Sequence, residues 1–144
     1  MGGLLVQDTD DSEEKTENWI SVTNKNPSNQ TNLDLNFAWK ICKHVKSNAI
    51  VIAKDQQTIG IGAGQMNRVG AAKIALKAAK GKCSEAVLAS DGFFPFADTV
   101  EIANDYGIKA IIQPGGSLRE QETIDICNSK GISMIFNQKR HFLN

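Results

Sequence analysis

Short apolar runs alternate with polar or glycine-containing segments along the chain, and their order predicts an α/β protein. The runs at 49–53 and 58–61 flank a polar turn and predict a β-hairpin. The predicted elements of the second half are a strand at 85–89, a helix at 98–106, a strand at 108–112, a helix at 117–129 and a strand at 132–136. Because short links join these elements, we expect right-handed parallel crossovers and a largely parallel sheet.

The first half of the chain adds further predicted elements, which are strands at 2–7 and 19–23, a helix over 33–45 and an alanine-rich helix over 68–80. Residues 8–18 and 24–32 are polar and are predicted to be loops. Thr31 or Asn32 is the predicted cap of the helix over 33–45, and Ser117 that of the helix over 117–129. The length of 144 residues predicts a single domain over 1–144.

The composition is that of an ordinary globular protein, with 41% apolar and 22% charged residues. Sixteen basic and sixteen acidic residues give zero net charge, which offers no support for binding to nucleic acid or to a membrane surface. No apolar run approaches about 18 residues, so no membrane span is predicted. The N-terminus lacks the pattern of a signal peptide, and we expect a cytoplasmic protein.

The cysteines and histidines do not form a pattern typical of a metal site. Cys42, Cys83 and Cys127 are widely spaced without a CxxC motif, and we interpret them as buried structural thiols in a reducing compartment. The two histidines, His44 and His141, lie far apart, so no metal site is predicted.

The most distinctive stretch combines the predicted hairpin with a glycine-rich corner, Gly60-x-Gly62-x-Gly64, and with Arg68 at a helix start. Backbone N–H groups and the helix dipole favour an anion there, and Arg68 could add a bidentate grip on phosphate or carboxylate. Alternatively, these glycines serve only the chain turn and close packing. The spacing is not GxGxxG, which disfavours a dinucleotide-dependent oxidoreductase.

Three further loops are predicted to leave the carboxyl ends of the parallel strands, where ligands bind in such sheets. They are residues 90–97, 113–117 and 137–144. The first contains Phe93, Phe94 and Phe96, which predict either a slot for a flat heterocycle or a loop folded back over the sheet. The second contains Gly115-Gly116 and is another candidate anion cradle.

Several motifs, SNAIVIAK, IGIGAGQMNR, ASDGFFPF, IQPGGS and the terminal RHF, closely resemble the C-terminal part of the AICAR transformylase family. This activity occurs in a bifunctional purine-biosynthesis protein that also carries IMP cyclohydrolase. The resemblance implies a cytidine-deaminase-like three-layer α/β/α sandwich, here the C-terminal half of the transformylase region. It also implies active sites formed in a homodimer and no catalytic zinc.

The resemblance further implies transfer of a formyl group from 10-formyltetrahydrofolate to AICAR in purine biosynthesis. Asn48 in SNAIV resembles the asparagine at the reacting centre. The positions that resemble substrate- and folate-binding residues are Arg68, Phe93, Pro95, Phe96, Asp98, Gly115, Gly116, Ser117, Arg140 and Phe142.

Two departures from the family pattern affect these expectations. The family's proton-transferring Lys-His pair, in a KHxNPCG-like motif, and its cyclohydrolase domain are absent, and Ala97 stands where the family usually has arginine. We therefore expect a C-terminal fragment or split half with little activity unless a partner supplies the Lys-His half. The alternative is a non-catalytic folate- or nucleotide-binding module. A zinc deaminase is disfavoured because the HxE and PCxxC ligands are missing.

Overall fold

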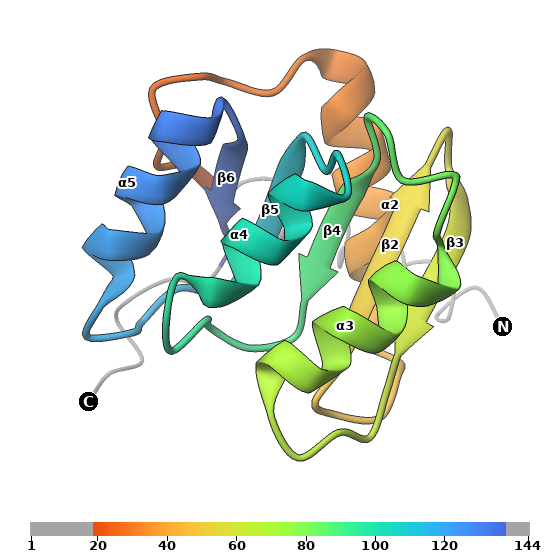
Figure 1. Ribbon diagram of the computed structural model, residues 1–144. Coiled ribbons are helices and arrows are strands. Elements are labelled where there is room, and N and C mark those ends of the chain that lie inside the picture. Colours follow the sequence, from red (N-terminus) through yellow and green to blue (C-terminus); the bar gives the residue numbers. More distant parts are fainter. Residues whose placement is uncertain (1–18, 138–144) are drawn as a thin grey trace, which may run out of the picture.

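The computed structural model describes residues 19–137, so the predicted strand at 2–7 and loop at 8–18 lie outside the described residues. The described part is a six-stranded sheet with helices on both faces (Figure 1). The strands are β1 (Ile20–Ser21), β2 (Ile50–Lys54), β3 (Gln57–Gly62), β4 (Val87–Ser90), β5 (Ala110–Gln113) and β6 (Ser133–Phe136). The helices are α2 (Asn29–Cys42), α3 (Arg68–Ala78), α4 (Asp98–Asp105) and α5 (Glu120–Lys130).

The sheet is mixed, with the strand order β1-β6-β5-β4-β2-β3. β4, β5 and β6 pair in parallel, whereas β1 with β6, β4 with β2 and β2 with β3 pair antiparallel. β3, β4, β5 and β6 consequently run in one direction, and their carboxyl ends meet at one edge of the sheet. The prediction of a largely parallel sheet is confirmed, because most of the strands run in the same direction.

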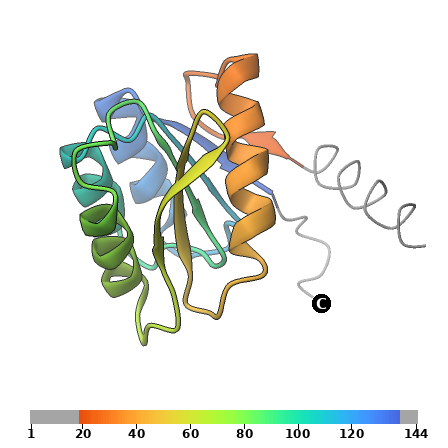
Figure 2. The same ribbon diagram turned by 90° about the vertical axis from the view of Figure 1, so that its right-hand side faces the viewer.

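Helices cover the two faces of the sheet unequally (Figure 2). α2 lies alone against one face, while α3, α4 and α5 cover the other. β4 illustrates why the sheet needs cover on both sides, because Leu88 faces the three-helix layer and Val87 and Ala89 face α2. All four residues of β4, β5 and β6 are buried, as expected for parallel strands between two helical layers. The three-layer α/β/α sandwich is confirmed.

The hairpin of β2 and β3 is held by a buried carboxylate from α2. Asp34 is 2% exposed, and its two oxygens accept hydrogen bonds from the backbone N–H groups of Gln56 (2.9 Å) and Asp55 (3.3 Å). Both turn residues have positive φ, 52° and 57°, as a tight hairpin turn requires. α2 therefore helps to position the hairpin, and with it β2, which directly follows Asn48 and Ala49.

Two predicted helix starts were wrong, and both errors trace to local capping. α2 begins four residues before the predicted helix, because Ser28 and not Thr31 or Asn32 is its cap; the Ser28 hydroxyl accepts from the Thr31 N–H at 3.2 Å. α5 begins at Glu120 rather than at Ser117. The Ser117 hydroxyl instead accepts from the Arg119 N–H (3.1 Å) and stabilises a turn that precedes the helix.

α3 packs unusually close to β3, and two glycines make this possible. A Cβ added at Gly62 would collide with the carbonyl oxygen of Ala71, and one at Gly60 would collide with that of Ala75. For these two glycines the interpretation as close-packing residues is confirmed. Their role is to seat α3 so that its first residue, Arg68, reaches Asn48 and Ala49, directly before the start of β2.

We expect Gly62→Ala to lower the free energy of unfolding by about 1–3 kcal/mol, because the added methyl group forces α3 away from β3. The collision is with backbone, the carbonyl carbon of Ala71 lying 2.9 Å from the added atom, so no side-chain rotation relieves it. Urea unfolding followed by circular dichroism measures the effect. Thr58→Ala, at an exposed position of the same strand, is the control. Equal stability of the two variants would contradict this packing account.

All three cysteines are free and buried, which confirms the prediction of structural thiols. Burial raises the pKa of Cys127 to about 12. It likewise raises that of Cys42 to about 12, with a smaller contribution from the negative charge of Asp91. The Cys42 thiol donates weakly to the carbonyl oxygens of Ala49 and Ala89, both at 3.6 Å. These thiols remain protonated near neutral pH and are therefore unsuited to nucleophilic chemistry.

Candidate functional site

A hollow of about 330 Å³ lies at the edge of the sheet where β3 and β4 end and β2 begins. Its lining residues are Asn48, Met66, Asn67, Arg68, Gly92, Phe93 and Pro95. They come from the segment before β2, the corner between β3 and α3, and the loop after β4. The position agrees with the prediction that ligands bind at the carboxyl edge of the strands.

The centre of the site is an ion pair between Arg68 and Asp91. The side chains are 10% and 14% exposed, so the pair is largely removed from water. The same guanidinium nitrogen also donates to the carbonyl oxygen of Ala49 (3.3 Å), and Asp91 accepts from the Ala49 N–H (3.1 Å). The sequence predicted a bidentate grip of Arg68 on phosphate or carboxylate; the carboxylate that it holds here is Asp91 of its own chain.

Asn48 is held by hydrogen bonds at both ends of its amide. Its Oδ1 accepts from Arg68 Nη2 at 2.7 Å, and its Nδ2 donates to the carbonyl oxygen of Gln65 at 2.9 Å. Because a guanidinium can only donate hydrogen bonds, the atom of Asn48 that faces Arg68 must be the amide oxygen. This contact fixes the orientation of the amide. An asparagine side chain has two donors and two acceptor lone pairs, so one N–H and one lone pair of Asn48 remain for a ligand.

Two site residues escaped the sequence analysis, Asp91 and Gly92. A Cβ at Gly92 would collide with the guanidinium of Arg68, so glycine leaves the room that this side chain occupies. Asp91 directly follows β4, and an acid at the carboxyl end of a predicted buried strand was the signal that could have identified it. The start of α3 lies at the same corner and is already capped, because the Asn67 side chain accepts a hydrogen bond from the Gly70 N–H (2.6 Å).

The surroundings of Asp91 act on its pKa in opposite directions. Burial alone would raise it, but hydrogen bonds from the Ser47 side chain and the Ala49 amide, together with Arg68, outweigh burial and hold the pKa below its usual 3.8. A carboxyl group whose pKa is lower in the folded state stabilises the fold above its unfolded-state pKa. That contribution is lost as pH falls toward the folded-state pKa.

We therefore expect acid to destabilise the natural chain more steeply than the Asp91→Asn variant between about pH 5 and pH 2. Asparagine keeps an oxygen acceptor for the Ala49 amide but cannot take up a proton. Urea unfolding at a series of pH values measures both slopes. Parallel pH profiles of the two proteins would show that the carboxyl group of Asp91 titrates alike in the folded and unfolded states, contrary to this account.

The loop after β4 divides its aromatic residues between the core and the surface. Phe94 is 1% exposed in the core, and its N–H donates to the Gln113 side chain (3.2 Å). Phe93 and Phe96 are 46% and 54% exposed, and Phe93 lines the hollow. The alternative of a loop folded back over the sheet holds for Phe94, whereas a slot for a flat heterocycle at Phe93 stays a prediction. Phe96 lies instead under the Arg119 guanidinium, 5.5 Å from its ring centre.

The glycine-serine loop after β5 is closed by groups of its own chain. Gly115 has φ of 82° and is packed against the ring of Phe136, where a side chain would collide. The N–H of Gly116 donates to the carboxylate of Glu120 at 3.1 Å. The position predicted for an anion cradle therefore already holds a carboxylate of the chain, and Ser117 is 9% exposed.

Asp98, another predicted site residue, is not among the residues that line the hollow. Asp98 is the first residue of α4, and its carboxylate accepts from the neighbouring Thr99 N–H at 2.8 Å. Arg140 and Phe142 lie outside the described residues. Within residues 19–137, no cluster of three His, Cys, Asp or Glu side chains is arranged to hold a metal ion. The helices described here are too short or too polar to cross a membrane.

Solved structures define the class of fold. RibD from Acinetobacter baumannii (form 2) matches 75% of this chain and 35% of its own, with a TM-score of 0.51 and 20% identity. A diaminohydroxyphosphoribosylaminopyrimidine deaminase/5-amino-6-(5-phosphoribosylamino)uracil reductase from Thermotoga maritima matches 72% of this chain and 36% of its own, with a TM-score of 0.50 and 18% identity. At this identity the likeness establishes only a shared deaminase-like α/β/α fold, as the sequence motifs implied.

The sequence comparisons define the family. The model of the AICARFT/IMPCHase bienzyme matches residues 1–78, and the chain belongs to this family. The bifunctional purine biosynthesis protein PurH of Prochlorococcus marinus (strain AS9601) is 91% identical over 144 residues, and that of strain MIT 9515 is 71% identical. Each alignment covers 100% of this chain and 28% of the relative. The resemblance seen in the motifs is confirmed at the level of the family.

Proposed function

We propose that this chain supplies one side of a formyl-transfer site that moves a formyl group from 10-formyltetrahydrofolate to AICAR. The observation that carries the proposal is the convergence of Asn48, Arg68 and Phe93 on one hollow at the carboxyl edge of the sheet. The motifs that contain them were those that resembled the transformylase. Membership of the bienzyme family and the names of its relatives support the same activity.

In this proposal Asn48 is the residue that touches the reacting groups. Formyl transfer forms a bond between the substrate amine and the formyl carbon, breaks the bond from that carbon to the folate nitrogen, and moves one proton from the amine to the leaving nitrogen. The free N–H and lone pair of Asn48 can bind the formyl oxygen and orient the amine. Such alignment matters because the amine of AICAR is a poor nucleophile.

Arg68 acts as a positioning residue, because its charge is balanced by Asp91 and one of its N–H groups holds the Asn48 oxygen. Phe93 and Pro95 form the exposed apolar wall of the hollow, which suits a flat ring of the substrate or of the pterin. We further propose that Phe96, Asp98, the 115–117 loop, Arg140 and Phe142 complete the folate and nucleotide contacts when the site is assembled.

None of the described residues that line the hollow is a histidine, a cysteine, a lysine or a carboxylic acid. His44 is exposed beyond the end of α2 and is not among the lining residues, and His141 lies outside the described residues. We therefore assign proton transfer to the family's Lys-His pair, supplied by another part of the protein or by a partner subunit. This chain alone should bind ligand weakly and transfer little or no formyl group.

Binding is tested by titrating AICAR and folic acid into the isotope-labelled chain mixed with the remainder of the strain AS9601 relative. Amide signals of residues 48, 68, 92 and 93 should shift in a saturable way. Shifts confined to other parts of the sheet would overturn the placement of the site. Saturable binding, together with no formyl transfer by the mixture when 10-formyltetrahydrofolate replaces folic acid, would instead support the non-catalytic binding module.

A further inference from the structure

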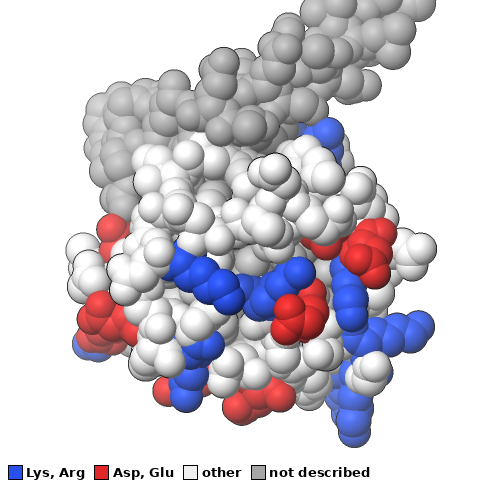
Figure 3. Space-filling view, turned by 90° about the horizontal axis from the view of Figure 1, so that it is seen from above, with Lys and Arg blue, Asp and Glu red and all other residues white. Residues whose placement is uncertain are grey.

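A second hollow, of about 410 Å³, lies at the opposite, amino-terminal edge of the sheet. It opens between the first turn of α2, the amino ends of β5 and β6, and the carboxyl end of α5. Figure 3 views the molecule from this edge and shows basic and acidic side chains interspersed there. The sheet separates this hollow from the proposed formyl-transfer site, so the proposed function does not account for it.

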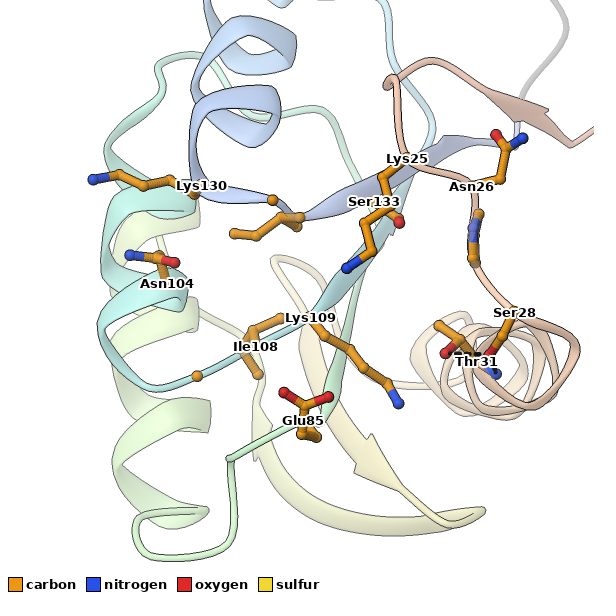
Figure 4. Close-up of a pocket in the computed structure, with 14 residues that line it drawn as sticks. Lys25, Asn26, Ser28, Thr31, Glu85, Asn104, Ile108, Lys109, Lys130 and Ser133 are labelled. Carbon is orange, nitrogen blue, oxygen red and sulfur yellow. Dashed lines mark hydrogen bonds between the residues drawn. The ribbon is translucent and has the colours of Figure 1, made fainter.

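Two lysines reach into this hollow from different segments. In Figure 4, Lys25 and Lys109 extend into the space between the first turn of α2 and the strands, whereas Lys130 points away from it. Neither Lys25 nor Lys109 forms an ion pair with any residue in the 19–137 range. Glu85 is the acidic residue among those that line the hollow. The two lysines that point inward and Glu85 together carry a net charge of one positive unit.

The side chain of Ser133 points independently to a ligand. Ser133, the first residue of β6, lines the hollow and is 2% exposed, yet its hydroxyl has no hydrogen-bond partner among the described residues. The N-terminus of the 14-residue helix α2 opens onto the same space through Ser28 and Thr31. Two ammonium groups, a free hydroxyl and the positive end of a helix dipole all favour a compact anion with several oxygen acceptors.

The segment that carries Lys25 is anchored, which keeps the hollow preformed. The Thr23 hydroxyl donates to the carbonyl oxygen of Lys25 (3.0 Å) and accepts from the N–H of Met134 (3.0 Å). The N–H of Asn24 donates to the side chain of Asn128 in α5 (2.9 Å). This small loop is thereby tied to both β6 and α5, and the cost of ordering Lys25 on binding is reduced.

We propose that this hollow is a second binding site, which takes a single phosphate group, either free phosphate or the phosphate of a small phosphomonoester. Lys25, Lys109 and Ser133 bind the phosphate oxygens at the start of α2. Glu85 repels additional negative charge, so the site discriminates against polyphosphates and nucleic acid. The cavity volume is within the range that holds a small metabolite.

The test is a titration of inorganic phosphate into the isotope-labelled 144-residue chain at constant ionic strength, repeated with glycerol 3-phosphate. Saturable shifts are expected for the amides of residues 28, 31, 109 and 133 with both probes. Lys25→Ala and Lys109→Ala should each weaken binding at least about tenfold, the usual loss for a charge-assisted hydrogen bond. Glu85→Gln should strengthen it, because the repelling charge is removed.

Lys77→Ala, which removes an exposed lysine from the outer side of α3, is the matched control and should bind like the natural chain. A preserved amide spectrum confirms that each variant is folded. Linear, non-saturating shifts, or equal losses of affinity in Lys77→Ala and Lys25→Ala, would overturn the proposal. Binding of glycerol 3-phosphate but not of free phosphate would support the proposal with a phosphomonoester as the ligand.

Discussion

Arg68→Met is expected to destabilise the folded chain by about 3–5 kcal/mol, the usual cost of removing one partner from a buried ion pair. Methionine fills much of the volume of the arginine stem, so the loss reports on charge and hydrogen bonds rather than on a cavity. Asp91 would remain largely buried with no cation, and Asn48 would lose the donor that orients its amide. Urea unfolding near neutral pH measures the change.

The double variant Arg68→Met/Asp91→Asn separates the ion pair from the other contacts of Arg68. Asparagine removes the stranded charge but still offers an oxygen to the Ala49 amide. The double variant should therefore be more stable than Arg68→Met, and the double-mutant cycle should give a favourable coupling energy between the two residues. A loss below about 1 kcal/mol in Arg68→Met would show that the pair behaves like an exposed salt bridge.

Asn48→Ala is expected to lower the rate of formyl transfer about 10²–10³-fold, the range found when one positioned donor is removed from a transition-state site. The assay follows FAICAR formation by the chain mixed with the remainder of the strain AS9601 relative. Asn48 contributes one N–H and one lone pair to the hollow, and alanine supplies neither. The free energy of unfolding should change by much less than the activation free energy that corresponds to this loss of rate.

Asn29→Ala is the matched control for Asn48→Ala, because Asn29 is exposed on the first turn of α2. Its activity in the mixture should equal that of the natural chain. If Asn48→Ala retained full activity, Asn48 would not touch the reacting groups. The formyl-transfer site would then have to lie at the loops after β5 and β6 and not at the hollow.

The order of elements was predictable from the sequence because local patterns specify them strongly. The polar turn between two β-branched runs identified the hairpin, and Gly107 and Gly131, both with positive φ, end helices where the pattern placed their ends. Helix starts were less predictable. At Ser117 and Thr31 several residues could cap a helix, and tertiary packing selected the one that does.

The candidate site was only partly predictable. Asn48, Arg68 and Phe93 were identified and lie together. The pairing of Arg68 with Asp91 was not foreseen, because it joins the ends of strands far apart in sequence and depends on the close approach of α3 to β3. Likewise, only the fold reveals that the Gly116 N–H donates a hydrogen bond to the carboxylate of Glu120. It also shows that Phe94 belongs to the core whereas Phe93 does not.

The most direct test of the central claim is FAICAR formation from AICAR and 10-formyltetrahydrofolate by three samples. These are the 144-residue chain alone, the remainder of the strain AS9601 relative alone, and the two mixed. We predict activity in the mixture only, with Asn48 on this chain and the proton carrier on the other. Full activity of this chain alone would contradict the account, because the proton carrier would then have to lie within these 144 residues.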